Sequence, residues 1–191
     1  MNHLYPVFLK VHELNILLVG GGNVGTEKLE FLLKSSPNAQ VTAVSKEFSP
    51  SFLELASKAE TVSMITDTYD EKYLGAKHLV IAATDDMEVN KLIHDQAKER
   101  FLLVNVADTP ALCDFYLGGI VTKGNLKIAI STNGKSPTAA KRLRQLFEEV
   151  LPEEMDELLN NLNAYRDTLK GDFEYKVKAM NKITKGLVTN R

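Results

Sequence analysis

Three glycines at a fixed spacing are the residues of this chain best suited to chemistry. Gly20, Gly22 and Gly25 form the pattern G-x-G-x-x-G, which is typical of a turn that binds the pyrophosphate of a dinucleotide. In such a turn the first glycine permits the tight bend, the second lets the phosphates approach the backbone, and the third lets a helix pack closely on the strand. The N–H groups at the helix start, here Asn23 and Val24, then face the phosphates.

The second candidate site follows the run Gln40–Val44, which reads as the next strand. The acidic residue that usually grips the ribose at this position is missing. Ser45 could hydrogen-bond the ribose, and Lys46 could accept a 2′-phosphate. The sequence therefore leaves the choice between NAD and NADP open, and it is equally consistent with two residues that only begin a loop.

Two further groups of polar residues follow later apolar runs, where open α/β sheets bind ligands. Thr84 and Asp85 come after one run, and Asn105 and Asp108 come after the next. Each group also has a purely structural interpretation. Asp85 with Glu88 fits a helix capping box. For Thr84-Asp85-Asp86 we therefore favour helix capping by the side chains and ligand contact by the backbone. Asp108 before Thr109-Pro110 fits a turn.

These candidates need a scaffold, and the chain alternates apolar strands with helical segments. This alternation predicts an α/β fold, a Rossmann-like parallel sheet with helices on both faces. The expected strands are 15–19, 40–44, 61–65, 78–83 and 101–106, and the expected helices are 26–34, 51–58 and 85–100, with a helical turn at 70–74.

The pattern changes after Asp108. Two strands at 115–122 and 126–131 are expected to form a hairpin through a glycine turn. A helix should follow, with Ser136 as N-cap and Pro137 in the first position, and with Leu143, Leu146, Phe147 and Val150 facing inward. Further helices are expected from Pro152 and after Gly171, the first with its apolar stripe at Met155, Leu158, Leu159, Leu162, Tyr165 and Leu169, the last with Phe173, Val177, Met180 and Leu187. Apolar stripes of this size favour pairing with a second subunit.

Composition excludes several classes of function. The net charge of −2 gives no basis for binding nucleic acid. No apolar run reaches membrane length, and the first residues lack a basic leader, so we expect a cytoplasmic protein. The single cysteine, Cys113, excludes an internal disulfide and is expected to be a small buried apolar residue. No two histidines have metal-ligand spacing, so we expect no metal site.

The motifs taken together resemble the precorrin-2 dehydrogenase/sirohydrochlorin ferrochelatase family, the N-terminal module of siroheme synthases. The resemblance covers residues 5 to about 152 and rests on five segments in order: Tyr5–Leu9, Leu18–Val24, Ala82–Asp86 with Asn90, Asn105–Pro110 with Cys113–Phe115, and Ile128–Pro137. One departure is Gly118-Gly119, where many members have a proline.

This resemblance implies NAD-dependent oxidation of precorrin-2, and in some members Fe²⁺ insertion into the product. It implies an intertwined homodimer, favours NAD despite Lys46, and makes Asp108 the catalytic residue. It also implies three parts, an NAD-binding domain at 1–112, a dimerisation region at 113–150 and a small helical domain at 151–191. Cations before and within the helix after Pro137 suit a substrate rich in carboxylates, although Lys and Arg on a helix most often form a solvated face. The expected substrate-binding residues are Thr132, Gly134, Lys135, Ser136 and Arg142. The rival hypothesis is a non-catalytic module that senses NAD.

Overall fold

The computed structural model describes residues 2–186 and divides the chain into two compact units. The first unit runs to Gly118 and includes Ser131–Ser136, and the second comprises Gly119–Ile130 and the chain from Pro137 onward. The division into three parts expected from the sequence stays a prediction. Among residues 2–186, no helix is long and apolar enough to span a lipid bilayer.

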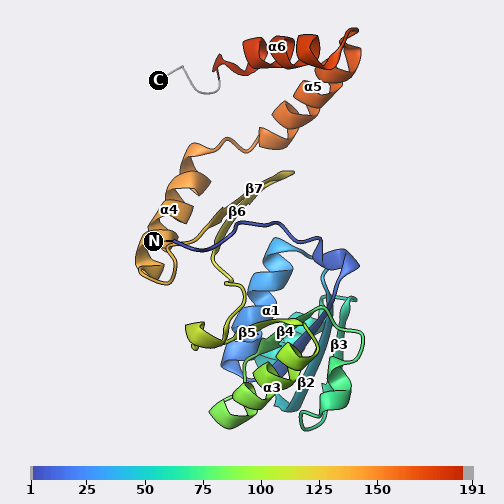
Figure 1. Cartoon of the computed structure of the whole chain (residues 1–191), viewed down its shortest axis with the longest axis vertical. Coiled ribbons are helices and arrows are strands. Elements are labelled where there is room, and N and C mark those ends of the chain that lie inside the picture. The colour runs from blue at the N-terminus through green and yellow to red at the C-terminus, as the bar shows by residue number, and fades with distance from the viewer. Residues whose placement is uncertain (1, 187–191) are drawn as a thin grey trace. The chain divides into compact units, whose positions relative to one another are not determined.

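The first unit is built on a parallel sheet of five strands in the order β3-β2-β1-β4-β5 (Figure 1). The predicted Rossmann-like α/β fold is therefore confirmed. Three α-helices and three short 3-10 helices connect or flank the strands. The strands are β1 (Asn15–Gly21), β2 (Gln40–Phe48), β3 (Val62–Thr66), β4 (Leu79–Ala82) and β5 (Leu103–Val106). The helices are α1 (Asn23–Ser35), α2 (Pro50–Ser57) and α3 (Met87–Glu99), with η1 (Val11–Glu13), η2 (Glu71–Leu74) and η3 (Pro110–Leu112).

Both faces of this sheet are covered, which is why its central strands are almost wholly apolar. Side chains alternate between the faces along a strand. Ile16 and Leu18 of β1 pack in the cluster that contains Leu29 of α1 and Phe52 of α2. Leu17 and Val19 of the same strand pack in a second cluster with Ile93 of α3. The polar carboxyl ends of the strands are consequently left at one edge of a rigid sheet.

The second unit contains an antiparallel hairpin, β6 (Gly119–Lys123) and β7 (Leu126–Ile130), and three helices, α4 (Pro137–Val150), α5 (Met155–Thr168) and α6 (Phe173–Thr184). Asp156 of α5 holds the hairpin turn, because its carboxylate accepts hydrogen bonds from Asn125 N at 2.8 Å and Asn125 Nδ2 at 2.6 Å. Gly124 lies beside this carboxylate with φ +56°, a left-handed conformation that favours glycine. The predicted glycine turn is confirmed.

Several predicted boundaries were wrong. The strand expected from Phe115 begins at Gly119, because the Phe115 carbonyl accepts a hydrogen bond from Asn105 and its ring packs on the sheet. The strand expected from Phe101 begins at Leu103, because Phe101 has φ +58° and ends helix α3. Helix α5 begins at Met155 rather than Pro152.

The face of α4 that was predicted to point inward is not buried within a single chain. Leu143, Leu146 and Val150 are 42%, 49% and 42% exposed. Phe173 and Val177 of α6 are exposed as well, and Leu187 lies outside the described residues. These apolar side chains are not covered by the described part of this chain.

Candidate nucleotide-binding site

The glycine turn joins β1 to α1, and close packing of the chain requires glycine at three of its positions, Gly20, Gly21 and Gly25. A Cβ atom on Gly21 would lie 2.6 Å from the Glu47 carbonyl oxygen. Gly20 has φ +116°, and a Cβ atom there would lie 2.2 Å from the Ala83 carbonyl oxygen. A Cβ atom on Gly25 would lie 2.0 Å from the Gly20 carbonyl oxygen. Nothing lies within 4 Å of a Cβ atom built on Gly22. The turn is therefore tight at its two ends and open at its middle glycine.

Helix α1 differs from its neighbours in how it begins. Its N-cap residue is Gly22, and no side chain accepts a hydrogen bond there. In contrast, the Ser49 hydroxyl caps α2 and the Asp86 carboxylate caps α3. The first N–H groups of a helix have no partner within the helix and carry a partial positive charge. Asn23 and Val24 present this polar end beside the open face of Gly22.

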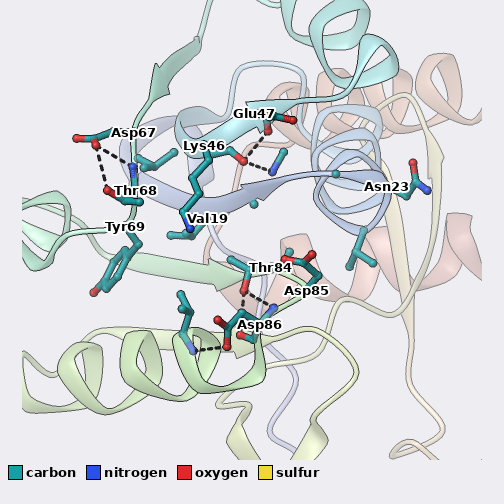
Figure 2. A pocket seen from close by; sticks show the side chains of 18 of the residues that line it. Val19, Asn23, Lys46, Glu47, Asp67, Thr68, Tyr69, Thr84, Asp85 and Asp86 are labelled. Atoms are coloured by element: carbon teal, nitrogen blue, oxygen red, sulfur yellow. Dashed lines mark hydrogen bonds between the residues drawn. The ribbon is translucent and has the colours of Figure 1, made fainter.

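A cavity of about 770 Å³ lies against this turn, at the carboxyl ends of β1, β2 and β4 (Figure 2). The position between β1 and β4 is where the strand order reverses, the usual binding crevice of such sheets. Thr84, Asp85 and Asp86 gather on one side, and Lys46 and Glu47 lie on the other. The lining comprises Val19–Val24, Val44–Glu47, Asp67–Tyr69, Ala83–Asp86, Val89 and Leu92.

Ser45 lines the cavity, but its hydroxyl already serves the backbone. Ser45 Oγ accepts a hydrogen bond from Gly21 N at 3.0 Å and donates one to Glu47 O at 2.6 Å. A hydroxyl has one proton and two lone pairs, so Ser45 could only accept a further hydrogen bond, for example from a ribose hydroxyl. Lys46 is exposed at the same strand end, and Figure 2 shows its side chain directed toward the cavity. The choice between NAD and NADP stays open on geometry alone.

The backbone groups of Thr84 are already hydrogen-bonded within the chain, and the ligand contact predicted for the backbone of Thr84 to Asp86 stays a prediction. The Thr84 N–H donates to Asn90 Oδ1 at 3.1 Å, and its carbonyl accepts from Asn90 Nδ2 at 2.9 Å. The predicted capping box is also wrong, since the cap of α3 is Asp86, whose Oδ1 accepts from Glu88 N at 2.9 Å and Val89 N at 3.2 Å. Asp85 makes no hydrogen bond or ion pair within residues 2–186. The Asp85 carboxylate is consequently free to contact a ligand in the cavity.

Asn105, within β5, and Asp108, after it, do not line the cavity. Asn105 is 6% exposed, and its amide donates to Phe115 O at 2.8 Å. Asp108 is exposed with φ +57°, and its carboxylate makes no hydrogen bond within the described residues. The turn closes instead through Thr109 N, which donates to Val106 O at 3.2 Å. The side-chain hydrogen bond of a turn-forming aspartate is therefore not what places Asp108 here.

Cys113 is only half buried and takes part in a polar network, which differs from the apolar role expected for it. Val106 N donates to its sulfur at 3.3 Å, and the thiol donates to Val106 O at 3.2 Å. Burial raises the pKa of this thiol. The thiol thus stays protonated and fixes the turn that precedes Phe115.

The predicted substrate-binding residues fall in both units. Thr132 closes its own turn, since its hydroxyl accepts from Ser136 N and donates to Ser136 O, both at 3.1 Å. Gly134 follows with φ +73°, and Lys135 is exposed. Arg142, on α4 in the second unit, donates to Gln145 at 3.0 Å. Their common role stays a prediction.

Three cavity residues after β3 were missed by sequence reasoning. Asp67 accepts a hydrogen bond from the Tyr73 hydroxyl at 2.5 Å and another from Thr68 N at 2.7 Å, and these lower the pKa of its carboxyl. The Tyr69 hydroxyl donates to Gln96 at 2.8 Å, and burial raises the pKa of Tyr69 to about 12. Their position directly after a parallel strand was the available signal.

The chain was compared with known proteins. A family model described as NAD(P)-binding matches residues 7–119, which is more than half of the chain. The chain belongs to this NAD(P)-binding family. A second model, described as sirohaem biosynthesis protein central, matches residues 123–149. Together with the relatives below, these matches confirm the predicted resemblance.

The chain is similar to siroheme synthases. It is 38% identical to siroheme synthase of Pseudoalteromonas atlantica over 174 residues, which cover 91% of this chain and 37% of the relative. It is 34% identical to siroheme synthase 1 of Klebsiella pneumoniae over 165 residues, covering 86% and 34%. The chain thus spans about a third of the length of these relatives.

The fold has a counterpart among solved structures. The structure of SirC, precorrin-2 dehydrogenase, matches with a TM-score of 0.76 at 24% identity, over 94% of this chain and 89% of that one. At this identity the likeness establishes the shared fold.

Proposed function

We propose that this protein oxidises precorrin-2 to sirohydrochlorin with NAD⁺, a step in siroheme synthesis. The observation that carries the proposal is the cavity over an open, uncapped glycine turn, in a chain that belongs to an NAD(P)-binding family and is similar to siroheme synthases. The similarity to a protein named precorrin-2 dehydrogenase supports the substrate. The cavity volume of about 770 Å³ is suited to a dinucleotide, since ligand sites of about 300–1,000 Å³ are usual.

The residues of the first unit suit the cofactor. The open face of Gly22 would let the pyrophosphate reach the backbone, and the N–H groups of Asn23 and Val24 would bind it. Gly20 and Gly25 would act indirectly by keeping the turn closed. Ser45 would accept a hydrogen bond from the ribose, and Asp85 would contact the cofactor with its uncommitted carboxylate. NAD⁺ supplies a nicotinamide that accepts a hydride.

The reaction removes a hydride from a ring carbon of precorrin-2 and then a proton from the cationic macrocycle. We assign the proton step to Asp108, whose carboxylate is exposed and free of hydrogen bonds within the described residues. The same negative charge would stabilise the cationic intermediate. Lys135 and Arg142 would attract the carboxylates of the substrate. Fe²⁺ insertion into the product stays a prediction from the resemblance.

We further propose a homodimer in the cytoplasm. The exposed apolar side chains of α4, Leu143, Leu146 and Val150, supply a surface that a second copy would cover. Strand β7 and nearly all of helix α4 lie in the segment that matches the sirohaem biosynthesis model. The cytoplasmic proposal rests on the expected NAD⁺ pool and on the single cysteine, Cys113, which cannot form an internal disulfide.

Turnover with precorrin-2 and NAD⁺ tests this function and separates it from a module that only senses NAD. We expect NADH and sirohydrochlorin to form together. A chain that binds NAD⁺ but yields neither product would favour the sensing role.

A further inference from the structure

Asn90 is a buried polar residue that neither lines the cavity nor belongs to the apolar core. It is 1% exposed on helix α3, one turn from the helix start. Burying an amide costs free energy unless all its groups are hydrogen-bonded. The partners of the Asn90 amide are therefore the key to its role.

Within residues 2–186, the hydrogen bonds of the Asn90 side-chain amide all go to a single residue, Thr84. Asn90 Oδ1 accepts from Thr84 N at 3.1 Å and from Thr84 Oγ1 at 2.8 Å, and Asn90 Nδ2 donates to Thr84 O at 2.9 Å. The amide therefore pairs with both backbone groups of Thr84, much as a neighbouring strand would. Strand β4 ends at Ala82, Ala83 N still donates to Val19 O at 2.8 Å, and the pairing with Asn90 extends the backbone hydrogen bonding to Thr84, two residues beyond the strand end.

The residue held in this way is the link between the glycine turn and the loop after β4. On one side, the Ala83 carbonyl packs so closely on Gly20 that a Cβ atom on Gly20 would lie 2.2 Å from the Ala83 carbonyl oxygen. On the other side, Asp86 N donates to Thr84 Oγ1 at 3.2 Å, and Asp86 caps α3. Asp85 stands between these two fixed residues and has no partner of its own within residues 2–186.

We propose that Asn90 is a positioning residue for the dinucleotide: by clamping Thr84 it holds Ala83 against the glycine turn and presents Asp85 to the cavity. The inference rests on the proposed function, because it assumes that NAD⁺ binds over Gly22. In this proposal Asp85 contacts the ligand, and Asn90 holds the loop in place without touching the ligand. Loss of the clamp should therefore weaken NAD⁺ binding in a protein that still folds.

Two substitutions at Asn90 test the clamp in the full chain. Asn90→Asp keeps the size but cannot donate to Thr84 O, and Asn90→Leu keeps a similar volume but removes every hydrogen bond. We expect the dissociation constant for NAD⁺, measured by calorimetry, to rise roughly five- to 150-fold in both, the range given by one unsatisfied buried group. The KM for NAD⁺ should rise more than kcat falls.

Ile93→Val is the matched control. Ile93 lies on the same helix, is 0% exposed and packs in the apolar cluster under the sheet. This variant should lower the melting temperature as a core substitution does and leave NAD⁺ affinity unchanged. A melting temperature that falls equally in all three variants, with affinity lost only at Asn90, supports the positioning role.

The outcomes separate the two proposals. A parent chain that binds no NAD⁺ contradicts the proposed function and the inference with it. A parent chain that binds NAD⁺, with folded Asn90 variants that bind equally well, contradicts the inference alone. Failure of both Asn90 variants to fold contradicts it too, because the amide would then serve the fold rather than the loop.

Discussion

Asp108 combines an exposed carboxylate with a left-handed backbone of φ +57°. Most residues are strained in this region, whereas aspartate and asparagine tolerate it. The side chain makes no hydrogen bond within residues 2–186, so neither the turn nor the fold depends on its charge. Exchange for asparagine consequently changes the chemistry of this residue with little change in structure.

We predict that Asp108→Asn abolishes most precorrin-2 oxidation and leaves NAD⁺ affinity and melting temperature at parental values. Loss of a general base lowers rates by about 10²–10⁴, and loss of a stabilising charge acts in the same direction. The rate of NADH formation with precorrin-2 measures the effect. Asp167→Asn, at an exposed position in α5, is the control and should be fully active. Oxidation by Asp108→Asn at nearly the parental rate would refute the catalytic assignment.

Residues governed by local geometry were predictable, and residues governed by tertiary contacts were not. The glycine spacing indicated the turn, because tight bends and close helix packing impose glycine at fixed intervals. The clamp of Asn90 on Thr84 was not predictable as a contact, since it depends on how α3 packs beside β4. Ser45 was identified as a cavity residue, but its hydrogen bonds to Gly21 and Glu47 depend on the pairing of two strands.

At the scale of elements, the end of helix α3 shows a conflict between sequence and conformation. Leu102 N donates to Ala97 O, and Phe101 N donates to Lys98 O, both at 3.0 Å. This is the pattern of a Schellman motif, whose left-handed residue is usually glycine. Here that residue is Phe101, with φ +58° and a side chain that is 95% exposed.

We predict that Phe101→Gly stabilises the protein by about 1 kcal/mol, because it relieves the left-handed strain and gives up almost no burial. Thermal denaturation should show a rise of roughly 2–4 °C. Phe101→Ala, which keeps the Cβ atom, should give little or no rise. NAD⁺ affinity should stay unchanged in both, since Phe101 does not line the cavity. A lower melting temperature for Phe101→Gly would show that the ring contributes more than its exposure indicates.

The same helix end explains which elements could be predicted. The central strands were found because both faces of the sheet are covered and the sequence there is continuously apolar. The start of β5 was misplaced because Phe101 is apolar and favours strands, whereas in the structure it is the left-handed residue that ends helix α3. The strand expected from Phe115 was misplaced because Asn105 holds its carbonyl, a contact over 10 residues that no local pattern reveals.

At the scale of the whole molecule, helix α4 of the second unit leaves apolar side chains exposed to water. Exposed apolar area of this kind costs roughly 25 cal/mol per Å² when it stays in water. Leu143, Leu146 and Val150 are each more than 40% exposed within the chain. The predicted subunit contact would cover them.

We predict that the protein is a dimer at micromolar concentration and that Leu146→Glu shifts it toward the monomer, because a charge in an apolar interface is left unpaired. Light scattering gives the mass directly. Lys141→Glu changes charge at an exposed position of the same helix and serves as the control, for which we expect a dimer. A monomeric parent protein would contradict the assembly.

The substrate site was the least predictable part of the molecule. Lys135 and Arg142 were selected for their charge, and they fall in different units of the chain. Recognition of a large anionic macrocycle depends on how separate elements and subunits come together, which sequence spacing does not encode. The cofactor site, in contrast, is built within one unit from residues at strand ends.

The most direct test of the account is a single-turnover reaction of the parent protein with precorrin-2 and NAD⁺, run beside Gly22→Asp. A Cβ atom at Gly22 would meet nothing within 4 Å, and the carboxylate of an aspartate would place bulk and negative charge where the pyrophosphate is proposed to bind. We predict one NADH for each sirohydrochlorin formed by the parent protein and neither product from a folded Gly22→Asp variant. Oxidation by Gly22→Asp at the parental rate, or no NADH from the parent protein, would contradict this prediction.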